Sequence, residues 1–497
     1  MILSESKRWD GLAIHGLWVI LIAGVVIRLG IYIHNRSLWQ DEAALAANIV
    51  GHSWGHLLGR LDYKQVAPPL FLLLSKLVYQ LIGHLEYSLR LLPLLVNCAS
   101  LYLISRILLR LASPPVAAMT LSLCAFGYPY IDWATNFKHY SSDLFCALLI
   151  VLAVFHWQKA SDRTRCFLAI SLPLLLWLSY TSGFLLVGLV FSVFVWSRKE
   201  PSLGRARPLL LLIGSLVVNA AFLYAIVARH SLGHSFMLSF WAKGFPRPPL
   251  VAWFAQNLFG LFGAPCRLFY GPALAFAICL FGFLRILRKQ SPAIAHLMAG
   301  TLVAAIIASF LRVYPFFGGR LTAYWSPLAL LMFAACFDGL ERDMPRSVFR
   351  TGALYMALSI AVISAAMTLC ASPSLISREE MRDVGKRLEM TIDASTPVFT
   401  TRAASAAFEI YGEPLIGRRA IKLKSHLLDA RDFAQTWRRS GAPRKFWLII
   451  SSSDFEDYRA FWASVGQYCE VVDVIKEARS AAVLYVVHRD ATRRRSE

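Results

Sequence analysis

The sequence predicts a polytopic α-helical membrane protein with about eleven transmembrane helices, followed by a small C-terminal α/β domain. The chain has 497 residues, of which 57% are hydrophobic and only 16% are charged, against about 25% charged in soluble domains. Several apolar runs approach the roughly 20 residues that one helix needs to cross a bilayer. From about Ala371 onward the composition changes, because charged residues become frequent and the apolar stretches become short.

The net charge of +21 reflects membrane topology and does not indicate a nucleic-acid partner. A soluble protein with this charge would be a candidate for nucleic-acid binding, but here many basic residues fall in short loops between apolar runs. The sequence contains no recognisable nucleic-acid module and no glycine-rich nucleotide loop. None of the nine cysteines forms a C-x-x-C pair, so neither a zinc site nor a disulfide framework is indicated. We therefore expect membrane lipids, and no nucleic acid, among the partners.

The first spanning helix begins close to the N-terminus. An apolar run from about Gly11 to Gly30 follows Lys7 and Arg8, and it is too long for the core of a signal peptide. We therefore expect an uncleaved first helix. The predicted spans lie near 12–31, 89–109, 115–131, 141–158, 166–180, 182–197, 208–228, 269–287, 292–311, 321–340 and 349–370.

The basic residues predict the orientation of these helices. If the N-terminus is cytoplasmic, every loop assigned to the cytoplasm is basic, as the positive-inside rule requires. The apolar segments 66–83 and 250–264 then lie at the outer interface without spanning the membrane. The long loops 32–88 and 229–270 face the outside, and long loops on one face of a scaffold are where sites tend to be built.

The domain organisation follows from this topology. We expect a transmembrane catalytic domain over 1–371 and a soluble extracytoplasmic α/β domain over 372–497, in a plasma or inner membrane. In the tail, 396–400 and 446–450 read as buried strands, and 470–475 and 481–487 read as two more. The segments 403–411 and 454–465 read as helices.

An acidic pair, Asp41 and Glu42, lies about ten residues beyond the first helix, in the predicted outer loop. A carboxylate there can act as a general base, taking the proton from an acceptor hydroxyl. The pair is also a candidate ligand set for a divalent metal, and no other cofactor is indicated. However, Ala43 to Val50 reads as a helix. The helix dipole favours acids in a first turn, so a purely structural role stays open.

A second cluster lies at the outer end of the fourth predicted helix. Lys138 is placed to pair with a lipid phosphate, with His139 and Tyr140 beside it, although anchoring of the helix at the interface is an alternative. Asp143 enters an apolar run, where an acid usually has a partner or a function. We expect that partner to be Lys138 or His139, about one helical turn away.

Two further cations lie in the outer loops. Arg320 follows Gly318-Gly319 and opens the tenth predicted helix, and its guanidinium fork suits phosphate oxygens, although a charged helix cap is equally open. Lys64 precedes Pro68-Pro69 and is a candidate third positive charge near the carrier phosphate, with a solvated loop lysine as the alternative. Together, an acidic pair and several cations converge on one membrane face. A polyprenyl-phosphate donor and a hydroxyl acceptor need this combination.

Three groups of residues match a known pattern. They are Trp39-Gln40-Asp41-Glu42-Ala43 with Ala67-Pro68-Pro69-Leu70-Phe71 and Ser88-Leu89-Arg90-Leu91-Leu92-Pro93; Lys138-His139-Tyr140-Ser141-Ser142-Asp143; and Tyr314-Pro315 through Arg320 to Pro327. Their order resembles membrane glycosyltransferases of the GT-C class, in particular the dolichyl-phosphate-mannose–protein mannosyltransferase-like group, glycosyltransferase family 39. The resemblance spans about 1–340. Ala67 replaces a basic residue frequent in that family, and Asn136 replaces an acid.

The resemblance implies a GT-C-like fold and a glycosyltransferase that takes a sugar from a polyprenyl-phosphate or dolichyl-phosphate carrier. It implies that Asp41 is the general base, that cations at the outer surface hold the phosphate leaving group, and that the anomeric carbon is inverted. A lone phosphate carrier needs no nucleotide pocket. The acceptor stays open among lipid, glycan and protein, and the sugar stays open between hexose and pentose.

Two other classes of protein remain as alternatives. A transporter or flippase of lipid-linked sugars would show inverted repeats and broken helices near the midplane of the membrane. We find no convincing internal repeat. A membrane scaffold whose tail binds a partner is the third class.

Overall fold

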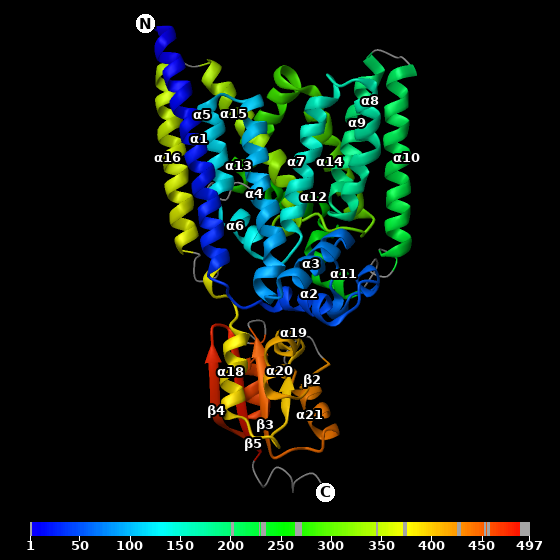
Figure 1. Cartoon of the computed structure of the whole chain (residues 1–497), viewed down its shortest axis with the longest axis vertical. Helices are drawn as coiled ribbons and strands as arrows, with labels where there is room; N and C mark the ends of the chain where they lie inside the picture. The colour runs from blue at the N-terminus through cyan, green and yellow to red at the C-terminus, as the bar shows by residue number, and fades with distance from the viewer. Residues whose placement is uncertain are drawn as a thin grey trace.

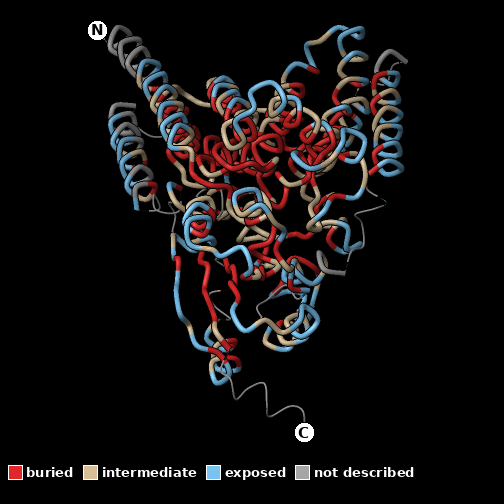
Figure 2. The backbone as a smooth tube through the Cα atoms, turned by 60° about the horizontal axis from the view of Figure 1, so that its bottom comes forward, coloured by how far each residue is buried: buried red, intermediate tan, exposed pale blue. Residues whose placement is uncertain are grey.

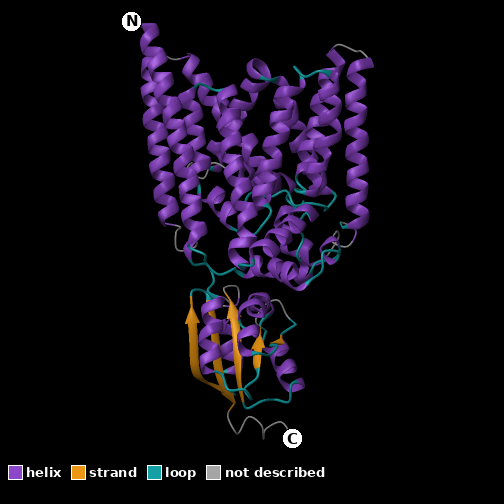
Figure 3. Ribbon diagram, in the orientation of Figure 1, coloured by secondary structure: helices purple, strands orange, loops and turns teal. Residues whose placement is uncertain are grey.

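The computed structural model consists of a large helical part with a small sheet domain below it (Figure 1, Figure 3). It describes residues 2–199, 203–227, 229, 235–263, 271–343, 346–370, 375–424, 429–451, 454 and 458–487. We use "helical part" for the described residues up to Cys370 and "sheet domain" for those from Leu375 onward.

The helical part is built almost entirely from helices and their short connections. In chain order they are α1 (Ile2–Ile33), α2 (Gln40–Gly51), η1 (His56–Leu58), η2 (Asp62–Lys64), α3 (Pro69–Ile82), α4 (Leu85–Leu111), α5 (Pro114–Phe126), α6 (Tyr128–Thr135), α7 (Tyr140–Trp157), α8 (Asp162–Ser171), η3 (Leu172–Trp177), α9 (Ser182–Lys199), α10 (Leu203–Ile226), α11 (Ser235–Phe240), η5 (Ala242–Gly244), α12 (Leu250–Gly263), α13 (Pro272–Arg285), η6 (Ile286–Gln290), α14 (Pro292–Phe310), η7 (Arg320–Trp325), α15 (Ser326–Asp343) and α16 (Arg346–Cys370).

The chain is an integral membrane protein. Among the described residues, six helical segments are long and apolar enough to cross a membrane: Ile14–Ile33, Leu85–Leu111, Tyr140–Trp157, Ala206–Ile226, Pro292–Phe310 and Arg320–Leu340. In Figure 2 the buried residues gather in the middle of the bundle, whereas the rim helices are largely exposed. These apolar rim surfaces are therefore the ones that lipid covers.

A helical segment lies at each of the eleven predicted spans, although how many of them cross the membrane stays a prediction. The prediction was wrong at 115–131, where α5 ends at Phe126 and α6 follows after a break at Gly127. Pro129 at the start of α6 has no N–H for the carbonyl of Ala125, and Arg28 of α1 satisfies this end of α5 by donating to the carbonyl oxygens of Cys124 and Ala125 at 2.9 and 2.8 Å. These are among the last carbonyls of α5, which have no partner within the helix.

The two apolar segments that were not expected to span are short helices, α3 and α12. Pro69 opens α3, where its missing N–H leaves no hydrogen bond unmade. Figure 1 shows α3 and α2 together at the end of the helical part that faces the sheet domain. The predicted loop 229–270 is described only in part, because 230–234 and 264–270 lie outside the described residues.

The sheet domain contains one five-stranded sheet in the order β2-β1-β3-β5-β4. Its elements are α18 (Met381–Thr391), β1 (Val398–Thr400), α19 (Arg402–Tyr411), α20 (Glu413–Ile416), β2 (Ile421–Lys422), α21 (Ala430–Arg439), β3 (Lys445–Ser451), α22 (Tyr458–Val465), β4 (Cys469–Glu477) and β5 (Ser480–Val487). β1 pairs in parallel with β2 and β3, whereas β5 pairs antiparallel with β3 and β4. Strands lie at all four predicted positions, and β2 was missed because two residues carry no periodicity.

The sheet domain and the helical part share one hydrophobic core. Leu38, Phe71 and Phe137 of the helical part belong to the same buried cluster as Phe408 and Trp447 of the sheet domain. Helix α19 packs against α2 within this cluster. The shared core places the loop that carries the predicted acidic pair directly against α19.

Candidate functional site

A cavity of about 710 Å³ lies where the helical part meets the sheet domain. Its lining comes from segments far apart in the chain. The residues are Trp39, Gln40, Asp41, Ala44, Tyr63, Lys64, Gln65, Val66, Lys138, His139, Tyr140, Phe240, Trp241, Arg320, Leu321, Arg378, Arg402, Ala403 and Ala406. The structure therefore brings six of the eight predicted site residues together: Asp41, Lys64, Lys138, His139, Tyr140 and Arg320.

Among the residues that the structure describes, Asp41 is the only carboxylate that lines this cavity. It lies in the first turn of α2, and 27% of its side chain is exposed. Arg320 donates from Nη1 to Oδ2 of Asp41 at 2.8 Å. Burial raises the pKa of Asp41, but the charges of Lys138 and Arg320 outweigh burial and hold that pKa below its ordinary value. Asp41 is therefore ionised at neutral pH.

Two cations from different elements surround Asp41. Lys138 follows α6, is buried, and donates from Nζ to Oε1 of Gln65 at 2.7 Å. Burial lowers the pKa of Lys138, and the negative charge of Asp41 offsets part of that effect. Arg320 begins η7 after Gly319, whose φ of +124° favours glycine because other residues would be strained there. The two cations and the carboxylate thus share one partly enclosed space.

Glu42 does not line the cavity, although it follows Asp41 directly. Its carboxylate is fully buried and accepts two hydrogen bonds from Arg90, at 2.9 and 2.6 Å. The backbone N–H groups of Phe137 and Trp39 also donate to it. Glu42 therefore fixes α2 against α4 and the segment at Phe137, and it does not face the cavity as its predicted catalytic role would require. Both of its oxygens accept hydrogen bonds, which argues against a metal held between Asp41 and Glu42.

His139 and Tyr140 line the cavity next to Lys138. Burial, with the charge of Lys138, lowers the pKa of His139 to about 3. His139 is therefore neutral at physiological pH and adds no positive charge toward a phosphate.

Asp143 lies deeper, outside the lining. Its Oδ1 accepts a hydrogen bond from Ser179 at 2.6 Å. His139 Nε2 is 3.9 Å from Oδ2 of Asp143. His139, one of the two expected partners, therefore lies within ion-pair distance of Asp143, and Ser179 from the loop after η3 is a closer partner that was not expected.

Sequence reasoning missed two cations of the cavity, Arg378 and Arg402. Arg378 stacks over the ring of Trp39 at 4.0 Å and forms an ion pair with Asp132 at 3.4 Å. Arg402 begins α19 of the sheet domain. No local signal marks either residue, because the docking of the sheet domain brings both to the cavity.

One group of residues has the composition of a metal site. Among the described residues, His52, His56 and Asp62 offer ligand atoms within 4.8 Å of one another. The His52 and His56 rings stack with centroids 3.8 Å apart, and His52 Nε2 is 2.8 Å from Asp62. The group is partly exposed and lies outside the cavity lining.

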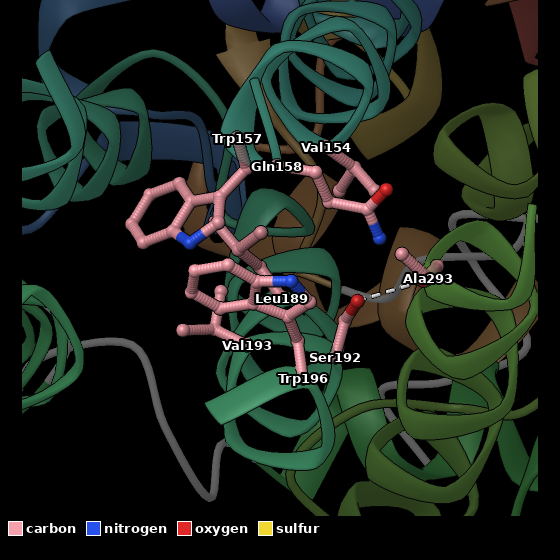
Figure 4. Close-up of a pocket in the computed structure, with 8 residues that line it drawn as sticks. All are labelled: Val154, Trp157, Gln158, Leu189, Ser192, Val193, Trp196 and Ala293. Carbon is pink, nitrogen blue, oxygen red and sulfur yellow. Dashed lines mark hydrogen bonds between the residues drawn. The ribbon is translucent and has the colours of Figure 1, made fainter. Parts of the chain in front are cut away.

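A much smaller cavity of about 10 Å³ lies between α7, α9 and α14 (Figure 4). Trp157, Leu189 and Trp196 line it, and Ser192 donates its hydroxyl to the carbonyl oxygen of Ala293 at 2.7 Å. A volume of roughly 10–15 Å³ holds about one water molecule. This cavity therefore cannot hold a substrate.

The apolar helices and the small sheet domain after them form a GT-C-like fold. ArnT from Cupriavidus metallidurans has this fold in two crystal structures, one bound to undecaprenyl phosphate and one in the apo state. Each matches this chain with a TM-score of 0.53 and 13% sequence identity, over 95% of this chain and 98% of ArnT. No family model matches the chain, and no curated protein sequence does. The predicted fold is confirmed, and membership of family 39 stays a prediction.

Proposed function

We propose that the chain is a glycosyltransferase that moves a sugar from a polyprenyl-phosphate carrier to a hydroxyl acceptor, with Asp41 as the general base. The observation that carries the proposal is the cavity lining, in which Lys138 and Arg320 flank a single carboxylate. The likeness in fold to ArnT solved with undecaprenyl phosphate supports a donor of the same class. Because one fold can host several chemistries, the argument depends on the side chains of the cavity.

In the proposed reaction the acceptor oxygen attacks C1 of the sugar while Asp41 takes the hydroxyl proton. The new C1–O bond forms as the bond between C1 and the phosphate oxygen breaks. Polyprenyl phosphate leaves with the bonding electron pair, and attack from the opposite side inverts the anomeric carbon. Lys138 and Arg320 stabilise the negative charge that builds on the departing phosphate.

The same cations control the basicity of Asp41. Without a donor, Lys138 and Arg320 hold the pKa of Asp41 below its ordinary value, so Asp41 is a weak base. A bound donor phosphate brings a negative charge that offsets these two cations, and the pKa of Asp41 then rises. Asp41 therefore becomes a stronger base when the donor is in place.

The other predicted residues take supporting roles in this proposal. Tyr140 lines the cavity beside Lys138, and its hydroxyl can donate a hydrogen bond to a phosphate oxygen. His139 is neutral and can make one hydrogen bond without adding charge. Glu42 acts through its contacts with Arg90 and is a positioning residue.

We place the cavity and the sheet domain on the extracytoplasmic side. The N-terminal end of α1 lies at the end of the helical part opposite the sheet domain (Figure 1). The basic loops that predict a cytoplasmic N-terminus therefore support an outward-facing cavity. Cysteines introduced at exposed Trp54 and Lys159 test this assignment. A membrane-impermeant thiol reagent added to intact cells is expected to label the first and spare the second.

The chemistry is tested with purified chain in lipid nanodiscs and a panel of radiolabelled polyprenyl-phosphate sugars, with a membrane extract as the source of acceptor. We expect wild-type chain to form a new glycoside and Asp41→Asn to lose about 10²–10⁴-fold in rate, the range that general-base catalysis contributes. Asp162→Asn is the matched control, since Asp162 is exposed and pairs with Arg165 in α8. Full transfer by Asp41→Asn would remove Asp41 from the mechanism. Movement of the lipid-linked sugar without a new glycoside would indicate a flippase.

A further inference from the structure

The cavity holds a second pair of cations that the proposed reaction does not use. Lys64 belongs to η2 of the helical part, and Arg402 opens α19 of the sheet domain. Burial lowers the pKa of Lys64, and the positive charges of Arg402 and Arg60 lower it further. Like charges that line one cavity repel one another, and an anion bound between them relieves the repulsion.

The backbone at Lys64 is held in a strained conformation. Tyr63 and Lys64 both have a φ of +54°, in the left-handed region. Residues other than glycine are strained there, and such positions concentrate at functional sites. The surrounding contacts must therefore hold this short segment in place.

The sheet domain supplies those contacts. The hydroxyl of Tyr63 donates to Glu409 of α19, and Lys422 of β2 donates to the Tyr63 hydroxyl at 3.0 Å. Lys422 also forms an ion pair with Glu409. The same domain that presents Arg402 thus fixes the residue that precedes Lys64. Ala403 and Ala406 of α19 line the cavity as well, and their small side chains leave room beside Arg402.

The charges of the cavity exceed those of the donor. The phosphodiester of a polyprenyl-phosphate sugar carries one negative charge, and its phosphate carries up to two once the sugar has left. Arg378 pairs with Asp132, and Asp41 offsets one of the positive charges of Lys138 and Arg320. With Lys64 and Arg402 counted, the four other cations and Asp41 give the lining a net charge of +3. This positive charge exceeds the one or two negative charges of the donor phosphate.

We propose that Lys64 and Arg402 form a second oxyanion subsite, which binds a phosphate or carboxylate group of the acceptor or of the transferred sugar. The planar guanidinium of Arg402 can hold two oxygens of such a group at once. The proposal rests on the proposed function, because it assigns Lys138 and Arg320 to the donor phosphate.

Binding to purified full chain in nanodiscs tests the two subsites separately. Titration with polyprenyl phosphate is expected to give affinities within twofold of wild type for Arg402→Gln and Lys64→Gln. Arg320→Gln is expected to weaken this binding at least tenfold. With polyprenyl phosphate saturating, inorganic phosphate is then titrated and followed by ³¹P NMR. We expect wild-type chain to bind it and each of the two subsite variants to bind it at least tenfold more weakly.

Arg439→Gln is the matched control, since Arg439 is exposed at the end of α21 and does not line the cavity. Unchanged thermal unfolding is required of every variant, and Lys64→Gln tests the subsite from a different element if Arg402→Gln does not fold. Failure of wild-type chain to bind polyprenyl phosphate would end the proposed function. Normal binding of polyprenyl phosphate without a phosphate site that depends on Arg402 would overturn the second subsite alone.

Transfer assays identify the molecule that carries the second anion. Acceptors are separated by anion exchange into a neutral and a retained fraction, and donors with a neutral sugar are compared with donors with a uronic-acid sugar. A loss of kcat/KM in Arg402→Gln confined to retained acceptors assigns the anion to the acceptor. A loss confined to uronic-acid donors assigns it to the sugar. An equal loss with neutral donor and neutral acceptor would contradict the proposal.

Discussion

Asp41 and Glu42 are adjacent in the chain but meet different surroundings. Successive residues of an α-helix are turned by about 100°, so one carboxylate of α2 faces the cavity and the other faces the buried interior. Asp41 keeps partial exposure and has two cationic neighbours, Lys138 and Arg320. Glu42 is enclosed by Arg90 and backbone donors, which also hold its pKa below the ordinary value in spite of burial. The sequence alone does not determine which of the two faces the cavity.

The low pKa of Asp41 predicts the pH dependence of the reaction. Asp41 must be ionised to accept a proton, so activity is present above its pKa and is lost as the pH falls through it. Arg320→Gln removes a positive charge and a hydrogen bond that lower the pKa of Asp41, so this pKa rises. We expect the acid limb of the kcat/KM profile to move to higher pH in Arg320→Gln, measured with the free enzyme between about pH 4 and 9.

Arg320→Gln is also expected to lower kcat/KM at every pH, because it weakens phosphate binding. That loss changes the height of the profile, whereas the pKa of Asp41 sets the pH at which the acid limb falls. Arg165→Gln serves as the control, since Arg165 pairs with Asp162 in α8 and not with a residue of the cavity. Its profile is expected to match that of wild-type chain. An acid limb that stays in place in Arg320→Gln would show that Asp41 is not the group that titrates.

At the scale of single elements, the buried pair of Glu42 and Arg90 holds α2 in register. Arg90 also donates to the backbone carbonyls of Arg36 and Ser37, at 2.6 and 3.0 Å, so one side chain fixes the whole entry to α2. Breaking a buried ion pair by removing one partner typically costs about 3–5 kcal/mol. Glu42→Gln is therefore expected to lower the free energy of unfolding by about 3–5 kcal/mol. It is also expected to lower the rate of sugar transfer, because Asp41 is displaced.

Thermal unfolding of the detergent-solubilised chain, followed by tryptophan fluorescence, measures the effect. Replacing both partners, as in Glu42→Leu with Arg90→Met, leaves no unpaired buried charge and is expected to recover much of the stability without recovering full activity. Glu389→Gln, at an exposed position of α18, is the control. Equal stability of Glu42→Gln and wild type would refute the structural role assigned to Glu42.

A helix or a helix break can be predicted from the sequence when the residues that cause it lie close to it in the chain. Apolar runs and flanking charges are local, so helical segments lie at all eleven predicted positions. The break after Phe126 has a local cause in Pro129, whereas the cation that satisfies the end of α5 is Arg28, almost a hundred residues earlier in the chain. The proline at Pro173 is a local cause of the same kind, and α8 gives way to η3 one residue before it.

At the scale of the whole molecule, the cavity exists because the two parts of the chain dock. Asp41, Lys138 and Arg320 lie in loops or at helix ends of one face, and topology alone could bring them near one another. Arg402 comes from α19, and its position depends on a core shared between the helical part and the sheet domain. No pattern near Arg402 encodes that docking. The sequence therefore predicted Asp41, Lys138 and Arg320 as site residues and did not predict Arg402.

A hydrogen bond at this interface gives a test of the docking itself. The buried N–H of Leu38 donates to the hydroxyl of Tyr411 at 2.9 Å, and that hydroxyl donates to Glu86 at 2.9 Å. Tyr411→Phe leaves the N–H of Leu38 unpaired, which typically costs about 1–3 kcal/mol. We expect hydrogen exchange of the backbone near Leu38 to quicken by roughly tenfold or more, since about 1.4 kcal/mol corresponds to one factor of ten.

Tyr458→Phe separates docking from the stability of the sheet domain. Its hydroxyl shares a hydrogen bond with Tyr485 at 2.9 Å, inside the other core of that domain. We expect this variant to loosen the sheet domain internally and to leave exchange near Leu38 unchanged. Because Lys64 is fixed from the same side, Tyr411→Phe is also expected to weaken phosphate binding at the second subsite more than polyprenyl-phosphate binding. Equal exchange near Leu38 in Tyr411→Phe and wild type would mean that the hydrophobic contacts alone hold the two parts together, and that this hydrogen bond does not contribute to the wall of the cavity.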